Sequence, residues 1–193
     1  MTEHAAAPKP LSELPAFDPQ TGNLNVVIET PKGSRNKYTY DPGCTAFRLR
    51  GVLPEGSSFP YDFGFIPSTL GEDGDPLDVL VLLDAPVPVG CLVEARPLGV
   101  IEAEQMERGA TARNDRLLAA AVHAHTHEEV RSLADLRPKL VDEIEQFFVH
   151  YNRTKGKEFR PLGRGDPDRA TALVDRGVRA RREPKGSGPP SSR

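Results

Sequence analysis

Short apolar stretches, separated by turns rich in glycine and proline, dominate the first two thirds of the chain. The strands that this pattern predicts cover residues 24–30, 37–41, 46–50, 59–65, 79–83, 91–104 and 116–122. Residues 37–41 and 46–50 alternate in polarity around Pro42-Gly43, which predicts a hairpin. Many short strands joined in this way are typical of a closed antiparallel β-barrel of the five-stranded, OB-like kind.

Two helices are predicted after the strands. From Pro138 to Tyr151, apolar residues recur at steps of three and four, as on the buried face of a helix. A second helix begins at Pro167, after the N-cap candidate Asp166, and runs to about Arg181. The predicted fold class is therefore mainly β with flanking helices (α+β), a five-stranded OB-like closed β-barrel plus two C-terminal helices.

The ends of the chain differ in composition from its middle. Residues 1–20 contain four prolines and are predicted to form a flexible arm, and residues 184–193 a disordered tail. Residues 21–183 form the single expected domain, which is long enough to bury a substantial core.

Composition narrows the class of protein. The formal net charge of −3 gives no overall basic field that would attract nucleic acid or a membrane surface. No apolar stretch reaches transmembrane length, and the N-terminal residues lack the features of a signal peptide. Cys44 and Cys91 are the only cysteines and indicate no disulfide framework or zinc site. A cytoplasmic protein is expected.

Three carboxylates fall within six residues in the stretch from Asp73 through Asp75 to Asp78, directly before the buried strand 79–83. Their mutual repulsion opposes this arrangement unless cations neutralise it, and clustered carboxylate oxygens suit Mg²⁺, Mn²⁺ or Ca²⁺. An acidic surface turn is the simpler alternative. An EF-hand loop is excluded, because Leu77 and Asp78 stand where that motif requires Asp or Asn and then Gly.

Aromatic residues occupy every second position from Phe59 to Phe65. Such a stripe is typical of the core side of a barrel strand, although single-stranded nucleic-acid binders use similar stripes to stack bases. The acidic cluster at 73–78 would repel a phosphate backbone, so the core interpretation is favoured.

The stretch from Asp73 to Leu80 and five further segments resemble the family I soluble inorganic pyrophosphatases. The further segments stand in the family's order and near its spacing, at residues 26–31, 36–38, 59–67, 96–100 and 147–151. The resemblance implies a β-barrel flanked by helices. It also implies an inorganic diphosphatase that uses Mg²⁺, with several ions per site and Mn²⁺ as a possible substitute.

The resemblance implies roles for the acidic residues. Asp75 would accept the proton of the attacking water, while Asp73 and Asp78 would bind the metal ions. Glu29, counted with the substrate-binding residues, would orient outer-shell water.

Cations and a tyrosine are implied to bind the phosphate groups. Lys37 and Tyr151 occupy two such positions, and Arg116 stands where the family has a lysine, which keeps the charge but changes its geometry.

Several positions depart from the family's pattern. Gly51 stands where a phosphate-binding arginine is expected, and the adjacent Arg50 could replace it only if a β-bulge re-aims its side chain. The other departures replace a glutamate, two tyrosines and a lysine, at Thr39, Phe59, Phe63 and Asn152. Arg153 and Lys155 are near enough in sequence to compensate for Asn152.

The expected pair of metal-binding aspartates is missing from the segment 102–116, which is longer than in the family. Glu104 and Asp115 are the predicted replacements, whereas strict alignment would put Asn114 at the second position. An asparagine offers a carbonyl oxygen without charge, so metal binding there should be weaker.

The leading functional hypothesis is Mg²⁺-dependent hydrolysis of pyrophosphate. One alternative is a phosphohydrolase for a larger phosphoanhydride, for which small or apolar residues at the altered positions would leave room. The other is a β-barrel that binds single-stranded nucleic acid through its aromatic stripe. The expected partners are pyrophosphate and further copies of the chain, a hexamer by resemblance, and neither nucleic acid nor a membrane.

Overall fold

The computed structural model describes residues 9–183 of the 193-residue chain. The predicted tail, residues 184–193, therefore lies outside the described residues, as do residues 1–8 of the predicted arm. Residues 9–20 differ from the expected flexible arm, because they lie against the barrel. The side chain of Ala16 is buried, and the amide of Ser68 donates a hydrogen bond of 3.0 Å to the carbonyl oxygen of Ser12.

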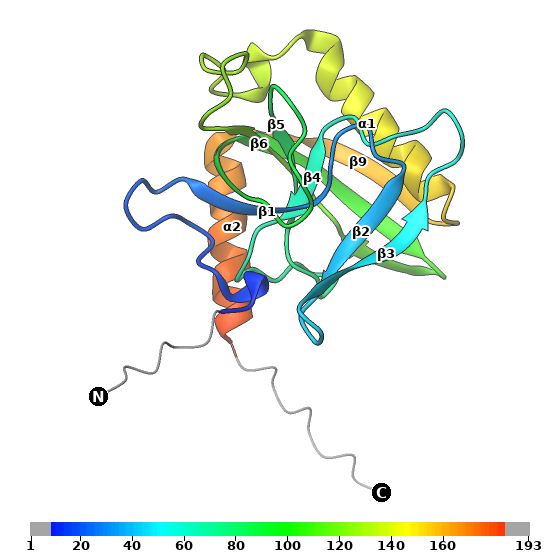
Figure 1. The fold of residues 1–193 in the computed structure, drawn as a ribbon. Coiled ribbons are helices and arrows are strands. Elements are labelled where there is room, and N and C mark those ends of the chain that lie inside the picture. The colour runs from blue at the N-terminus through cyan, green and yellow to red at the C-terminus, as the bar shows by residue number, and fades with distance from the viewer. Residues whose placement is uncertain (1–8, 184–193) are drawn as a thin grey trace, which may run out of the picture.

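A ring of five strands forms the centre of the fold (Figure 1). Its members are β1 (Leu24–Thr30), β4 (Asp62–Phe65), β5 (Asp78–Leu82), β8 (Arg116–Ala121) and β6 (Leu92–Glu107). They pair in that order, and β6 pairs back with β1, which closes the ring. The predicted five-stranded barrel is confirmed, with one difference: β5 and β8 are parallel, because the long excursion through β6 separates them.

Four further strands lie outside this ring. The predicted hairpin is present as β2 (Asn36–Asp41) and β3 (Ala46–Val52), which form a separate two-stranded sheet. Two strands that the pattern did not predict, β7 (Ala110–Arg113) and β9 (Glu158–Gly165), pair with the second half of β6. Both are poor in buried apolar residues, so pairing with β6 and not apolar alternation makes them strands.

Two helices cover the barrel from different sides (Figure 1). Helix α1 (Pro138–Arg153) buries Ile144 and Phe148 against the even-numbered core residues of β5, such as Leu80. Helix α2 (Pro167–Arg182) packs with the odd-numbered ones, such as Val79. This division follows from the alternation of side chains along a strand. Short 3₁₀ turns occur at Leu11–Glu13 and Leu133–Asp135.

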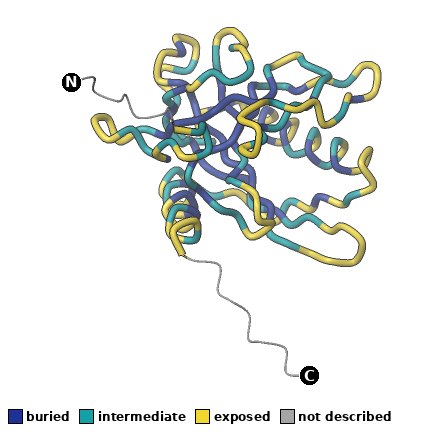
Figure 2. The backbone as a smooth tube through the Cα atoms, turned by 60° about the horizontal axis from the view of Figure 1, so that its bottom comes forward, coloured by how far each residue is buried: buried dark blue, intermediate teal, exposed yellow. Residues whose placement is uncertain are grey.

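The buried positions follow the barrel strands, while the connecting loops and the strand tips are exposed (Figure 2). Phe59, Phe63 and Phe65 are all buried, which confirms the core interpretation of the aromatic stripe. The strand itself begins only at Asp62. None of the helices within residues 9–183 is long and apolar enough to cross a membrane.

Candidate active site

A cavity of about 560 Å³ opens where the acidic stretch, the β2 strand and the end of α1 meet. Seven of the ten residues predicted for the site line it, namely Glu29, Lys37, Asp73, Asp75, Asp78, Arg116 and Tyr151. Below, this cavity is called the central pocket. A smaller cavity of about 300 Å³ lies on the α2 side of the acidic stretch, and Asp73, Asp78 and Asp115 line it.

The acidic stretch is held by its backbone, and two of its three carboxylates, those of Asp73 and Asp75, form no ion pair among residues 9–183. Gly74 takes a positive φ of 90°, and the amide of Gly71 donates to the carbonyl oxygen of Asp75 at 2.7 Å. Within residues 9–183, neither Asp73 nor Asp75 forms an ion pair. Burial raises the pKa of the Asp73 carboxyl, and the charges of Asp78 and Asp75 add to the increase. Such crowding of charge is relieved when a cation binds.

Helix α2 fixes the position of this stretch from behind. The amide of Leu70 donates to the carbonyl oxygen of Gly177 at 3.0 Å, and the hydroxyl of Thr69 accepts from the amide of Leu77 at 3.0 Å. A Cβ atom at Gly177 would lie only 2.9 Å from the Leu77 side chain. Glycine costs about 1 kcal/mol inside a helix, so the close approach explains its presence there.

Glu29 and Lys37 form a buried pair at the floor of the pocket. The Lys37 amino group donates to Glu29 Oε2 at 2.8 Å, and the amide of Tyr40 donates to Glu29 Oε1 at 2.7 Å. Burial raises the pKa of Glu29, although the charge of Lys37 opposes this. The Lys37 nitrogen also lies 4.3 Å from the ring centroid of Phe63, one of the positions where the family has tyrosine. The pair therefore holds one cation in a fixed position at the pocket.

The opposite rim is basic and comes from the end of α1. The amino group of Lys155 donates to the hydroxyl of Tyr151 and lies 4.1 Å from its ring centroid. Burial of the amino group, together with the charges of Lys37 and Lys157, lowers the pKa of Lys155 to about 8. Burial raises the pKa of Tyr151, which therefore stays a hydroxyl and a hydrogen-bond donor.

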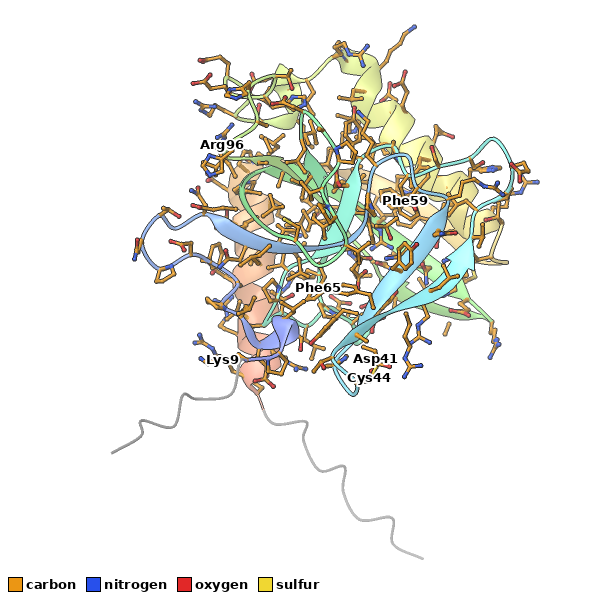
Figure 3. The ribbon with its side chains drawn as sticks, viewed as in Figure 1. Lys9, Asp41, Cys44, Phe59, Phe65 and Arg96 are labelled. Carbon is orange, nitrogen blue, oxygen red and sulfur yellow. The ribbon has the colours of Figure 1, made fainter. Side chains whose placement is uncertain are left out.

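Aromatic packing fixes this rim. The ring of Phe59 lies 5.5 Å from that of Tyr151 and 5.3 Å from that of Phe147, centroid to centroid. In Figure 3, Phe59 lies beside α1, close to the second half of the helix. The phenylalanine that replaces a tyrosine here thus orients Tyr151 by its ring alone.

Sequence reasoning missed three charged residues that line the pocket, namely Glu107, Lys157 and Arg181. Lys157 and Glu107 both line it and form an ion pair of 2.7 Å. Lys157 directly precedes β9, which the pattern did not predict, and its spacing of two from Lys155 is the only signal that could have found it. Among the suggested compensating residues, Lys155 lines the pocket and Arg153 does not.

The pocket wall formed by β6 and β8 differs from the predicted one. Glu104 faces away from the pocket and pairs with Arg160 at 2.5 Å on the other side of the strand, where both line a separate small cavity. The next residue, Gln105, lines the pocket instead, because successive side chains of a strand point to opposite faces. The prediction that Glu104 replaces a metal-binding aspartate of the pocket is therefore not supported.

The carboxylate of Asp115 is engaged in contacts outside the central pocket. Its Oδ1 atom accepts from the amide of Ala103 at 2.9 Å and pairs with Arg113 at 2.8 Å, so it ties β6 to β8. Asp115 lines only the smaller cavity, whereas Asn114 lines both. The geometry thus favours Asn114, the strict-alignment alternative, as the residue that faces the acidic stretch.

The β-bulge considered for Arg50 is present, yet it does not bring the side chain to the pocket. Lys37 pairs with Gly51 and Tyr38 with Leu49, which leaves Arg50 as the extra residue. Arg50 is exposed and does not line the pocket. The prediction that it replaces the missing arginine is therefore not supported.

The chemistry of the remaining donors fits a divalent cation such as Mg²⁺. Asp73 and Asp78 present hard carboxylate oxygens to one space, while the amide oxygen of Asn114, which also lines that space, accepts from Arg116. Within residues 9–183, no group of three or more His, Cys, Asp or Glu side chains is gathered as closely as a metal site requires. The observation that favours a cation here is that Asp73, Asp75 and Asp78 line one pocket while Asp73 and Asp75 have no ion-pair partner among residues 9–183.

Comparison with known proteins identifies the family. Residues 26–182 match the family model described as inorganic pyrophosphatase. An inorganic pyrophosphatase from Nostoc sp. is 41% identical over 170 residues, which cover 88% of this chain and 98% of that protein. The crystal structure of inorganic pyrophosphatase from Thermus thermophilus superposes with a TM-score of 0.82 at 33% identity, covering 91% of this chain and 100% of that one. The chain therefore belongs to the inorganic pyrophosphatase family.

Proposed function

We propose that this chain hydrolyses inorganic pyrophosphate to two phosphates in a reaction that requires a divalent cation, Mg²⁺ first of all. The observation that carries this proposal is the central pocket, in which Asp73, Asp75 and Asp78 line the same space as the cations Lys37 and Lys155. Opposed acidic and basic groups suit a metal-bound polyanion, because the carboxylates bind the cation and the amino groups bind the phosphoryl oxygens.

Each residue has a chemical task in this proposal. Asp73 and Asp78 would hold the cation, which neutralises the charge of the substrate and makes water a stronger nucleophile. Asp75 would accept the proton of the attacking water, since no hydrogen bond from residues 9–183 occupies its carboxylate in the structure. Mn²⁺ presents similar preferences for oxygen ligands and could replace Mg²⁺.

The phosphate-binding tasks fall to the floor and the basic rim of the pocket. Lys37 is held by Glu29 at the floor, and Lys155 and Tyr151 stand at the rim. Lys157 would join them when it leaves Glu107. Glu29 would keep Lys37 in place and order water near the cation.

A larger phosphoanhydride is a second candidate substrate. A volume of about 560 Å³ lies within the range of pockets that hold organic ligands. A Cβ atom built on Gly51 meets no atom within 4 Å, so the missing arginine leaves open space. Nucleic-acid binding loses its support, because the aromatic stripe that would stack bases is buried at Phe59, Phe63 and Phe65.

Phosphate release from pyrophosphate, ATP and a simple phosphate monoester, with and without Mg²⁺, tests the proposal. We expect release from pyrophosphate that requires Mg²⁺ and stops in excess chelator. Faster release from ATP would favour the larger substrate. Full activity of a protein shown by metal analysis to be metal-free would contradict the proposal. The homohexamer implied by the resemblance and the cytoplasmic location expected from composition stay predictions, and light scattering would test the first.

A further inference from the structure

Arg116 occupies an unusual position in the central pocket, at the start of β8. Its side chain is almost fully buried, and its guanidinium carbon lies 5.2 Å and 5.5 Å from the ring centroids of Phe148 and Phe159. Its Nη1 atom forms an ion pair with Asp78 Oδ2 at 2.5 Å. Arg116 therefore already serves as the cation of a residue that is expected to bind metal.

The hydrogen bonds of this guanidinium are poorly matched. Nη1 carries two protons but lies against three oxygen atoms, those of Asp78, the Asn114 side chain and the Asp115 carbonyl. At the same time, Nε is buried without a hydrogen-bond partner among residues 9–183. An arrangement with too many acceptors at one nitrogen and none at another gains if the contact to Asp78 is released and Nε finds an acceptor.

The surroundings favour such a release. The Asp78 side chain is 27% exposed, so a cation from solvent can reach it, whereas the Arg116 side chain is only 6% exposed and its guanidinium lies beside Phe148 and Phe159. Asn114 in turn donates to Gln105 Oε1 at 3.2 Å. Two neutral amides therefore lie on this side of Arg116, while the Asp73 carboxylate also interacts with its charge.

We propose that Arg116 is an internal counter-ion that competes with the divalent cation for Asp78 and, once displaced, donates to the anionic substrate. Two positive charges cannot both lie close to one carboxylate without repulsion, so metal binding releases the guanidinium. The released group remains in the same pocket and adds a donor for a phosphoryl oxygen. Metal binding and anion binding are thereby coupled through one side chain. This inference rests on the proposed metal-dependent function.

Binding measurements without turnover test the competition. Free Mn²⁺, counted by electron paramagnetic resonance, is titrated into wild type and into Arg116→Met, which keeps an unbranched stem between the two phenylalanines but removes the charge. We expect Mn²⁺ to bind more tightly to the variant, by about 5- to 150-fold, the usual range of coupling between sites. Methylenediphosphonate, added at saturating Mn²⁺, should bind more weakly to the variant.

These opposite signs separate the proposal from a structural role, since a damaged pocket would weaken both ligands. Arg160→Met is the matched control, because it removes the same charge outside the pocket, and it should change neither affinity. Unchanged or weaker Mn²⁺ binding by a folded Arg116→Met protein would overturn the proposal. Because no substrate is hydrolysed, this result is independent of whether the chain turns over pyrophosphate.

A second measurement uses the wild-type chain, in case the methionine variant does not fold. The Nε–Hε resonance of Arg116 in ¹⁵N-labelled protein is assigned by its absence from the spectrum of Arg116→Lys. Saturating Mg²⁺ should shift this resonance, while that of Arg160 stays in place. A resonance of Arg116 that does not move while Mg²⁺ binds would equally overturn the proposal.

Discussion

Two walls of the central pocket differ in how their polar and charged side chains are paired. The wall formed by the acidic stretch presents Asp73 and Asp75 without an ion-pair partner among residues 9–183 and with few hydrogen bonds. The wall formed by β6 and β8 is bonded within itself, from Gln105 through Asn114 to Arg116. The first, called the open wall below, leaves carboxylate lone pairs available to a ligand. The second, called the closed wall, forms hydrogen bonds among its own donors and acceptors.

The difference shows what a binding wall requires. Burial, and to a smaller extent the charges of Asp78 and Asp75, raise the pKa of Asp73, and carboxylates placed in this way favour binding of a cation. The wall formed by β6 and β8 consists of amides and one arginine, and the charge of that arginine is paired with Asp78 of the acidic stretch. Substitutions of the carboxylates in the open wall should therefore change the rate of hydrolysis and its dependence on metal. Substitutions on the side of the closed wall that faces away from the pocket should change these quantities little.

The largest effect is expected from Asp75→Asn. The substitution keeps the size of the side chain but removes the base, and a general base contributes about 10²- to 10⁴-fold to a rate. We expect kcat for pyrophosphate to fall by that factor without recovery at high Mg²⁺. Circular dichroism should be unchanged, because Asp75 is exposed and only its backbone holds the loop. Recovery at high Mg²⁺ would make Asp75 a metal ligand and direct the search for the base to Glu29.

Asp73→Asn and Asp78→Asn should give the next largest effects and differ from each other. Both remove a metal ligand, so both losses of activity should recover in part as Mg²⁺ is raised. Only Asp78→Asn also removes the counter-charge of buried Arg116, which keeps its acceptors at Asn114 and Asp115 but loses its ion pair. Urea denaturation without metal should therefore show a lower free energy of unfolding for Asp78→Asn than for Asp73→Asn. Equal stabilities would mean that the ion pair contributes nothing.

A smaller effect should appear in the pH dependence of substrate binding. The pKa of Lys155 is about 8, below the ordinary 10.5, so its amino group loses its charge as the pH rises through 8. We expect KM for pyrophosphate to rise severalfold between pH 7.5 and 9.5, or about as much as one lost phosphate contact. Lys155→Arg keeps its charge over this range and should show a flatter profile, measured at fixed free Mg²⁺.

The lowered pKa of Lys155 affects the stability of the fold in the opposite direction: substrate binding weakens as the pH rises, but stability increases. Since the folded state binds the proton of Lys155 less tightly than the unfolded chain does, this group lowers stability below pH 8. Its unfavourable contribution disappears as the pH rises from about 8 to 10.5.

The KM profile has its own contradicting outcome. If KM rises with pH to the same extent in the wild-type protein and in Lys155→Arg, a group other than Lys155 titrates.

The sequence predicted the parts of this molecule that depend on neighbours along the chain. The buried strand at 24–30, the helix from Pro138 and the acidic stretch with Asp73, Asp75 and Asp78 all follow from local patterns, and the structure places those three carboxylates in one pocket. Strand β9 could not be predicted in this way, because its residues become a strand only by pairing with β6.

The closed wall shows most clearly what local sequence patterns cannot predict. Along a strand, an offset of one residue moves a side chain to the other face. The sequence offered Glu104 and Asp115 as carboxylates, but the pocket receives their neighbours Gln105 and Asn114. Residue type favoured Glu104 and Asp115, whereas the strand register places Gln105 and Asn114 in the pocket. That register depends on how β6, β7 and β8 pair across the long hairpin.

The smallest expected effect tests this register. Glu104→Gln removes a carboxylate that pairs with the exposed Arg160, so stability should change by no more than about 1 kcal/mol. The dependence of pyrophosphate hydrolysis on Mg²⁺ should stay the same, because the side chain lies outside the pocket. The matched substitution Gln105→Glu, one residue away, adds a carboxylate to the pocket and should lower the Mg²⁺ concentration needed for half-maximal rate. If Glu104→Gln instead raises that concentration and Gln105→Glu has no effect, the strand faces the pocket with the other set of side chains, and the closed wall described here is wrong.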